Sequence, residues 1–240
     1  TTKQTNGQYY EQKTGLALSM RSFHNYIKDQ VIQKYCKPRL DGTKVIQKTV
    51  LDIGIGRGGD LSKFYKSGIK KIVGIDLDDS SFNVPNGTTD KFNKLTKNNT
   101  QRTVSNIKIP NDIEGVFIKA DISHELSENV QKKVLQNMTN NNAELIIKHI
   151  ENQKFDIVNC QFTIHYIFNN EANVKKYFNN INKLLKKGGY LFISCFDADV
   201  VHNVLQKQDG KLIINDETNI NNVDVLFSIE QQYETKSISN

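Results

Sequence analysis

Apolar residues recur at helical spacing early in the chain and then form five short, almost continuous runs. The first pattern, over residues 16–35, repeats every three or four positions and predicts a helix with one apolar face. The five runs are rich in Val, Ile, Leu and Phe, which is typical of parallel strands covered on both faces. They lie at residues 49–53, 71–76, 115–119, 155–160 and 190–196. The pattern therefore predicts an α/β fold with a mostly parallel sheet and helices on both faces.

The segments between these runs give weaker signals. Residues 171–186 have an apolar face and predict a helix that stops at the following Gly-Gly pair. Residues 78–112 and 123–152 are polar, and we expect them to be insertions on the loop side of the sheet. Two further short strands are expected at 211–214 and 223–229.

A chain of 240 residues is long enough for one α/β core. We expect a single domain over residues 1–240. It would contain a helical segment at 1–45, a cofactor-binding core at 46–200 and the beginning of a substrate-side insertion at 201–240. We also expect the C-terminal end of the domain, with the last strands of its sheet, to be incomplete.

Composition narrows the class of protein further. The formal charge of +6 suits a polyanionic partner, and equally suits simple solubility. Cys36, Cys160 and Cys195 are scattered, which favours structural thiols in a reducing compartment over a metal site, and no metal is expected. No apolar run approaches the ~20 residues of a membrane span, and the polar N-terminus is unlike a secretory signal. We therefore expect an intracellular protein that does not bind membranes.

The first run leads into a glycine-rich turn at residues 54–59, and Asp76 ends the second run. This combination binds an adenosine-containing cofactor, or forms a tight turn without a ligand. Asp52 and Asp60 flank the turn and would repel a pyrophosphate, which argues against an NAD-dependent oxidoreductase. They favour a cationic cofactor, S-adenosylmethionine, whose ribose hydroxyls Asp76 would bind.

Two later segments also carry candidate chemistry. Asp121 follows the third run, where it would meet the adenine amino group or would be an ordinary strand-end or helix-cap aspartate. Residues 161–166 follow the fourth run and should line the ligand crevice, because ligands bind at the carboxyl ends of parallel strands. There Phe162 and Tyr166 would stack on a purine and His165 would hydrogen-bond it, unless the aromatic residues belong to the core.

Four segments, in this order, resemble the mRNA cap guanine-N7 methyltransferase family. They are RSFHNYIK at 21–28, LDIGIGRGGDL at 51–61, GID at 74–76 and QFTIHY at 161–166. The resemblance covers residues 9–196 and is greatest to the methyltransferase modules of capping enzymes of large DNA viruses. It implies a Rossmann-like class I methyltransferase that transfers a methyl group from S-adenosylmethionine to N7 of the mRNA guanine cap, leaving S-adenosylhomocysteine.

The resemblance also implies roles for individual residues. The implied cofactor-binding residues are Lys28, Asp52, Gly54, Gly56, Asp60, Asp76, Asp121, Ile122 and Gln161. The implied cap-binding residues are His24, Asn25, Arg57, Lys63, Phe162, His165 and Tyr166, with Tyr9 or Tyr10 as an additional aromatic contact. Because guanine N7 carries a lone pair and no proton, no acid or base catalyst is expected, and His165, Tyr166 and Phe162 would act by positioning.

The expected partner is the capped 5′ end of RNA. Triphosphatase and guanylyltransferase modules of the same polypeptide, or a stimulatory subunit, are further expected partners. The protein would act in the host cytoplasm or virion if viral, and in the nucleus if cellular. Two alternatives stay open: a methyltransferase that acts on another substrate, and a non-catalytic fragment that depends on a partner.

Overall fold

The computed structural model describes residues 18–97, 101–215 and 225–232, and the chain divides into two compact units. The larger unit, Lys28–Cys195, holds the parallel sheet. The smaller unit is formed by residues 1–27 and 196–240. Within it, helix α8 (Ala198–Gln206) precedes an antiparallel pair, β10 (Lys211–Asn215) and β11 (Val225–Glu230). Helix α2 (Leu18–Tyr35) begins in the smaller unit and ends in the larger one.

The sheet of the larger unit has the strand order β7-β4-β3-β8-β9, and all neighbouring strands are parallel. The strands are β3 (Thr49–Ile53), β4 (Lys71–Asp76), β7 (Glu114–Lys119), β8 (Phe155–Gln161) and β9 (Leu185–Ser194). Numbered along the chain within this sheet, the order is 3-2-1-4-5, as in doubly wound nucleotide-binding folds. The α/β, Rossmann-like fold predicted from the sequence is therefore confirmed. Such folds bind ligands at the carboxyl ends of the strands, where the order reverses between β3 and β8.

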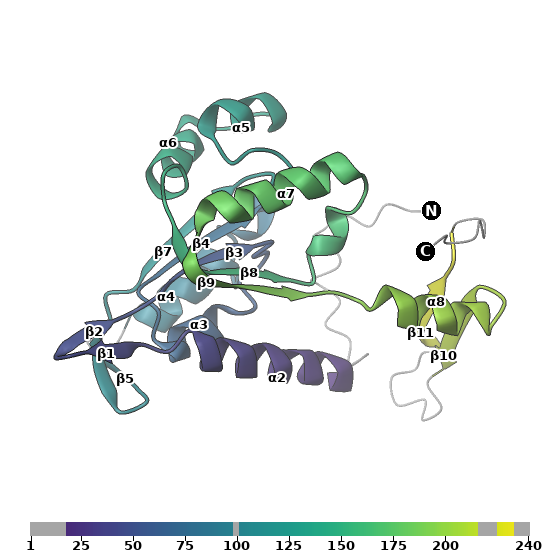
Figure 1. The fold of residues 1–240 in the computed structure, drawn as a ribbon, viewed down its shortest axis with the longest axis horizontal. Coiled ribbons are helices and arrows are strands. Elements are labelled where there is room, and N and C mark those ends of the chain that lie inside the picture. Colours follow the sequence, from purple (N-terminus) through teal and green to yellow (C-terminus); the bar gives the residue numbers. More distant parts are fainter. Residues whose placement is uncertain (1–17, 98–100, 216–224, 233–240) are drawn as a thin grey trace. The chain divides into compact units, whose positions relative to one another are not determined.

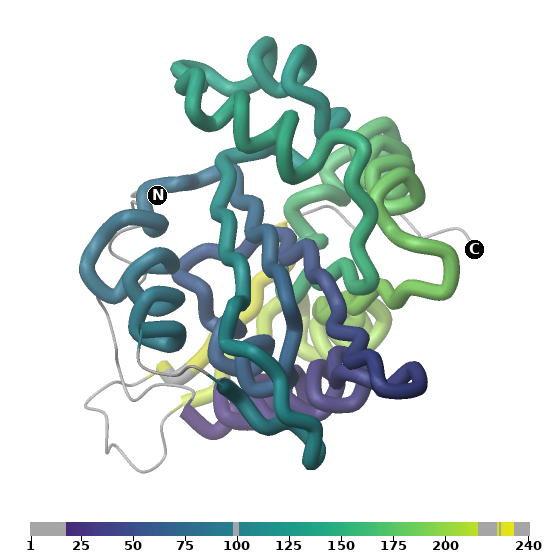
Figure 2. The backbone as a smooth tube through the Cα atoms, turned by 90° about the vertical axis from the view of Figure 1, so that its left-hand side faces the viewer, coloured from purple at the N-terminus to yellow at the C-terminus, as the bar shows by residue number. Residues whose placement is uncertain are grey.

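Helices cover both faces of this sheet (Figure 1). One face packs against α3 (Leu61–Ser67), α4 (Thr88–Thr96) and the second half of α2. The other packs against α6 (Asn140–His149) and α7 (Glu171–Leu184), with α5 (Glu128–Val134) beside α6. Figure 2 shows α5 and α6, in teal, on the same side of the strands as green α7.

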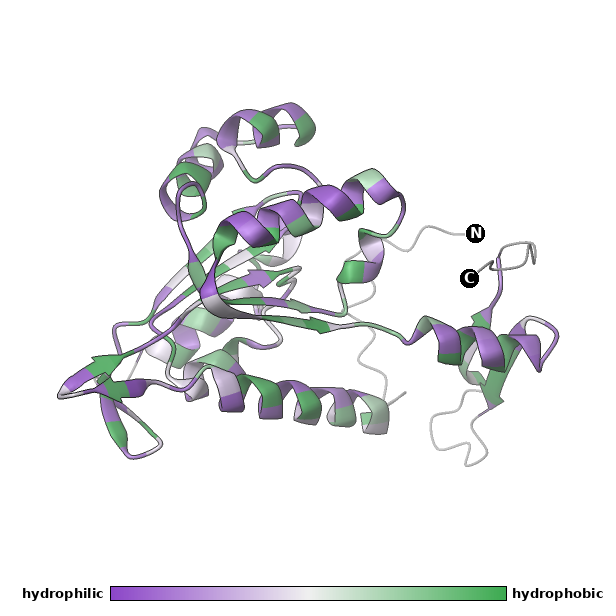
Figure 3. Ribbon diagram, in the orientation of Figure 1, coloured by the Kyte–Doolittle hydropathy of each residue, from purple (hydrophilic) through white to green (hydrophobic). Residues whose placement is uncertain are grey.

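Consecutive strand residues are buried in opposite layers. Val50 and Ile157 pack on the α2–α3 side, whereas Leu51 and Val158 pack on the α6–α7 side, and all four side chains are inaccessible to solvent. Side chains alternate across a strand, so a sheet covered on both faces needs apolar residues at successive positions. Figure 3 shows green, apolar stretches along the strands of the sheet and mixed green and purple bands along the helices that cover it.

The expected end of the helix at residue 186 and the expected start of the fifth strand at residue 190 were both wrong. Helix α7 ends at Leu184 and β9 begins at the next residue, so Gly188 and Gly189 lie in the strand and do not stop the helix. The early part of β9 is fixed at the amino end of β8, where Lys186 Nζ lies 3.0 Å from both carboxylate oxygens of Asp156. Pairing with β8 therefore overrides the local helix-stop signal.

The first polar insertion also lies elsewhere than expected. It contains α4, the crossover helix between β4 and β7, and a hairpin of β5 (Gln101–Val104) and β6 (Ile107–Pro110). Buried Arg102 of this hairpin donates to the carbonyls of Tyr65 (2.8 Å) and Ile69 (2.9 Å), just before β4 begins. The hairpin thus lies at the amino end of the sheet, as does the hairpin of β1 (Arg39–Asp41) and β2 (Lys44–Ile46), which leads into β3.

The apolar face of α2 is less buried than its spacing predicted. Met20, Phe23 and Ile27 are each more than 40% exposed, and the one fully buried side chain of the helix is Ile32. The sequence pattern predicts the helix correctly, but it does not tell how much of the apolar face is covered.

Candidate cofactor and substrate site

The glycine turn after β3 has a backbone that ordinary residues adopt only with strain. Gly54 and Gly56 have φ of +71° and +50°. The N–H groups of Gly54 and Ile55 both donate to the carbonyl of Ile75 in β4, at 2.8 and 3.2 Å. A Cβ on Gly54 would lie 2.4 Å from two side-chain atoms of Thr163, in the segment after β8. Because Gly54 has no side chain, the segments at the carboxyl ends of β3, β4 and β8 can lie in close contact.

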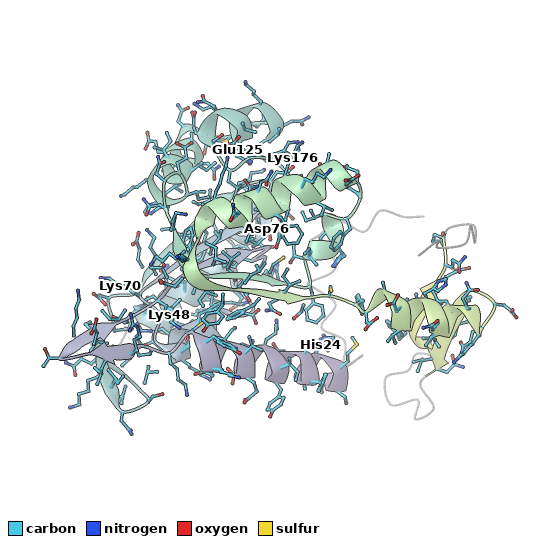
Figure 4. The ribbon with its side chains drawn as sticks, in the orientation of Figure 1. His24, Lys48, Lys70, Asp76, Glu125 and Lys176 are labelled. Carbon is cyan, nitrogen blue, oxygen red and sulfur yellow. The ribbon has the colours of Figure 1, made fainter. Side chains whose placement is uncertain are left out.

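Asp76 connects the end of β4 to this turn. Gly56 N–H donates to its Oδ2 (2.8 Å) and Asp78 N–H donates to its Oδ1 (3.0 Å). Burial raises the pKa of Asp76, and these backbone hydrogen bonds oppose the rise. Each carboxylate oxygen accepts up to two hydrogen bonds, so the group keeps acceptor capacity for two hydroxyl donors. Figure 4 labels Asp76 together with Lys48 and Lys70, which precede β3 and β4 at the opposite edge of the sheet.

A second acid at the turn, Asp60, is the centre of a buried ion cluster. Lys28 from α2 and Lys63 from α3 place their ammonium groups 2.9 and 2.8 Å from Asp60 Oδ1. Lys63 Nζ also donates to the carbonyl of Gly59 (3.3 Å). Lys28 was expected on the cofactor and Lys63 on the cap, and the structure brings both to one carboxylate.

The third acid, Asp52, begins a chain of polar side chains that crosses three strand ends. Asn159 donates to Asp52 Oδ1 (2.7 Å), Gln161 donates to Asn159 Oδ1 (2.8 Å), and Ser194 donates to Gln161 Oε1. Burial, together with the nearby charge of Asp60, raises the pKa of Asp52 to about 7. Asn159 and Ser194 were not predicted; the polar Asn159 within the fourth apolar run was the available signal.

Asp121 follows β7 and is held in a compact turn. Its Oδ1 accepts from Ser123 N–H (2.9 Å), and its Oδ2 lies 3.0 Å from His124 Nδ1. Ile122 is buried beside it. Because β7 neighbours β4, this turn lies next to the strand end that carries Asp76.

The segment after β8 presents aromatic side chains at the same edge of the sheet. Phe162 has φ of +54°, a strained value for a non-glycine residue, and its N–H donates to the carbonyl of Ser194 (2.9 Å). The short helix η2 (Ile164–Tyr166) then buries Ile164 and leaves His165 and Tyr166 exposed, with ring centroids 4.2 Å apart. Tyr166 is 72% exposed and therefore does not belong to the core.

Arg57 lies in the glycine turn, half-buried. Two side chains of helix α4 hydrogen-bond to the backbone of the turn. Thr88 Oγ1 donates to the carbonyl of Gly56 (2.5 Å), and Lys91 Nζ donates to the carbonyl of Arg57 (2.6 Å). The sequence gave no signal that Thr88 and Lys91 would hydrogen-bond to the glycine turn, because each lies 32 or more positions from the residue it contacts.

The remaining predicted cap residues belong to the smaller unit. His24 is half-buried and Asn25 exposed on the first half of α2, and the His24 and Phe23 rings lie 6.3 Å apart. Tyr9 and Tyr10 lie outside the described residues.

The described part of the chain was also compared with the requirements of a metal site and of a membrane-spanning helix. No three His, Cys, Asp or Glu side chains in it gather where one metal ion would bind. No helix in it combines the length and apolar character that crossing a membrane requires. Burial raises the pKa of the Cys36 and Cys160 thiols to about 12 and about 11, which keeps both protonated, whereas Cys195 is exposed.

Known proteins resemble this chain over most of its length. The family model of the mRNA (guanine-N(7))-methyltransferase domain matches residues 2–236. A probable mRNA-capping enzyme of Acanthamoeba polyphaga mimivirus is 40% identical over 225 residues, covering 94% of this chain and 18% of the viral protein. An mRNA cap guanine-N(7) methyltransferase of Caenorhabditis elegans is 30% identical and covers 80% of this chain and 43% of that protein. The chain thus spans less than half the length of either relative.

Solved structures give a more distant likeness. An S-adenosylmethionine-dependent methyltransferase from Clostridium acetobutylicum ATCC 824 is 17% identical, covers 82% of this chain and 58% of that one, and superposes with a TM-score of 0.44.

Proposed function

The chain belongs to the family of mRNA (guanine-N7)-methyltransferase domains, and on that premise we propose that it transfers a methyl group from S-adenosylmethionine to N7 of the guanine cap of mRNA. The observation that carries this proposal is the convergence of Asp52, Asp60 and Asp76 on a glycine turn. Exposed aromatic side chains follow the neighbouring strand at the same edge of the sheet.

The charges of the turn fit this cofactor and not a dinucleotide. The carboxylates of Asp60 and Asp76 lie at the turn with the ammonium groups of Lys28 and Lys63, and Asp52, whose pKa is raised to about 7, adds a further negative charge when it is ionised. S-adenosylmethionine has a cationic amine and a cationic sulfonium, so its methionyl end is complementary to such a site, whereas a pyrophosphate would add charge of the same sign. We propose that Asp76 holds the ribose, that Asp60 with Lys28 holds the methionyl end, and that Gln161 and the buried Asp52 complete this pocket.

The bound cofactor supplies a methyl group activated by its sulfonium. Guanine N7 attacks with a lone pair and loses no proton, so the chain needs no general base. The residues of the larger unit act by orientation and electrostatics: Phe162 and Tyr166 would wall the purine, His165 would orient it, and Arg57 with Lys63 would bind the triphosphate bridge.

The greater length of the relatives supports a proposal about partners and location. We propose that this domain works beside triphosphatase and guanylyltransferase modules of one polypeptide, or with a stimulatory subunit, as the length of the viral capping enzyme suggests. It would act inside the cell on the capped 5′ end of RNA, in the host cytoplasm or virion for a viral protein.

Methyl transfer from labelled S-adenosylmethionine to GpppG-capped RNA tests the substrate, with small amines and proteins as competing acceptors. We expect label on capped RNA alone, and transfer only to another acceptor would contradict the cap assignment.

Binding of S-adenosylhomocysteine, measured by isothermal titration, tests the cofactor. Asp76→Ala should abolish it, and Asp112→Ala, which removes an exposed acid at the amino end of β7, should not. Arg57→Ala should weaken cap binding most at low salt, because it removes a phosphate contact.

A further inference from the structure

The loop that follows β7, residues 121–126, is held by two buried side-chain amides that no motif includes. One is Gln131 of α5, which is inaccessible to solvent, and the other is Asn180 of α7, which is 3% exposed. Both side chains point their polar atoms at the backbone of this one loop.

Gln131 makes three hydrogen bonds to the loop backbone. Its Oε1 accepts from Asp121 N–H (2.8 Å), and its Nε2 donates to the carbonyls of Asp121 (3.0 Å) and Glu125 (2.9 Å). The amide therefore closes the loop by joining its first residue to its fifth. Both amide hydrogens of the side chain are used.

Asn180 repeats the arrangement from the opposite helix. Its Nδ2 donates to the carbonyls of Ile122 (3.0 Å) and His124 (2.7 Å), and its Oδ1 accepts from Leu126 N–H (3.3 Å). Lys183, one turn later in α7, also pairs with Glu125, which Figure 4 labels near α7. A buried amide whose hydrogen bonds are all satisfied by one loop fixes that loop in a single conformation, because any other would leave polar groups unpaired.

The fixed loop presents a specific pair of hydrogen-bonding groups. The Asp121 carboxylate accepts from both Ser123 N–H and Ser123 Oγ at Oδ1 and pairs with His124 at Oδ2, which leaves about one acceptor position open, on Oδ2. The N–H of the next residue, Ile122, donates to no residue in the described part of the chain. An acceptor followed by a donor matches the amino group and N1 of adenine, and both positions are reversed in hypoxanthine.

We propose that Gln131 and Asn180 are positioning residues that hold residues 121–126 in the shape that distinguishes adenine from other bases on the cofactor. This rests on the proposed function, since it requires S-adenosylmethionine to bind. Neither amide touches the cofactor; each acts through the backbone of the loop.

The test compares S-adenosylhomocysteine with S-inosylhomocysteine, in which hypoxanthine replaces adenine, by isothermal titration of the protein. The wild type should bind the adenine form about 100-fold more tightly, as expected for two hydrogen bonds lost or reversed. Gln131→Met, which keeps the length of the side chain, and Asn180→Leu should each lower that ratio about tenfold. Gln47→Met is the matched control, because Gln47 also donates to a backbone carbonyl, that of Gly68 (3.0 Å), but far from the loop; its ratio should equal that of the wild type.

The ratio, and not the affinity alone, decides the proposal. If Gln131→Met and Asn180→Leu bind both ligands less tightly but keep the wild-type ratio, the amides are merely structural and the inference is overturned, while the proposed function stands. If the wild type binds neither ligand, the proposed function fails and the inference with it. Should Gln131→Met not fold, Asn180→Leu decides in its place, with the same tenfold fall of the ratio expected.

Discussion

Replacing Gly54 by alanine should lower the free energy of unfolding for two separate reasons. The first is backbone strain, since φ at this position is +71°; an alanine there costs about 1 kcal/mol. The second is overlap, because the new Cβ would lie 2.4 Å from Thr163 Cγ2 and Oγ1 and 2.8 Å from its Cβ. Relieving such an overlap in a packed site costs a further 1–3 kcal/mol, roughly. Gly54→Ala should therefore lower the free energy of unfolding by about 2–4 kcal/mol.

The hairpin glycine Gly42 provides a matched control. It has φ of +58° and no atom within 4 Å of its ideal Cβ position, so alanine there adds the strain without the overlap. Gly42→Ala should lower the melting temperature by about 2–4 °C, and Gly54→Ala by about 4–16 °C. Thr163→Ala in the Gly54→Ala background removes the two nearest atoms and should restore part of the loss.

Thermal unfolding followed by circular dichroism measures these shifts, and titration with S-adenosylhomocysteine measures their effect on the pocket. The same melting temperature for Gly54→Ala and Gly42→Ala would refute the argument that Gly54 makes a close approach to Thr163. An effect of Gly54→Ala that Thr163→Ala does not reduce would refute it independently.

Three further substitutions test other parts of the site. Burial raises the pKa of Asp52 to about 7 in the folded state, whereas an aspartate in the unfolded chain loses its proton near pH 4. Between these pH values the folded state therefore binds a proton that the unfolded state does not. The free energy of unfolding should therefore fall between about pH 4 and pH 7, and urea titrations should show a smaller fall for Asp52→Asn. Lys28→Met leaves Asp60 with one ammonium partner and should cost about 1–3 kcal/mol, whereas Lys183→Met at an exposed ion pair should change stability by less than about 0.5 kcal/mol. His165→Ala should lower turnover on capped RNA and leave S-adenosylhomocysteine affinity unchanged; a loss of cofactor affinity would assign this exposed residue to the other pocket.

Much of the fold could be predicted from local patterns. Each of the five apolar runs is a strand of the parallel sheet, and the expected helix over 171–186 is α7, two residues shorter than expected. The same reasoning missed α4 and the β5–β6 hairpin, because their residues are polar and their packing depends on distant partners such as Arg102. The resemblance to cap methyltransferases, first seen in four short segments, is confirmed by a family match over residues 2–236.

The candidate site divides in the same way. Asp52, Asp60 and Asp76 were predicted as acids at strand ends or beside the turn, and the sheet order brings their segments together. Asn159, which donates to Asp52, and Gln131, which holds the backbone of Asp121, were not predicted, because a lone Asn or Gln in a sequence does not show which backbone group or carboxylate it will meet.

The sequence by itself determined the strands, the glycine turn and the sign of the charge around it, because these depend on the residues of one short segment. Only the tertiary structure decided which partners the charged and amide groups would have. Lys28 meets Asp60 from 32 positions away and Asn159 meets Asp52 from 107 positions away. Such contacts depend on the order and register of strands that are distant in sequence, and a hydrogen bond forms only once packing has brought its donor and acceptor within about 3 Å of each other.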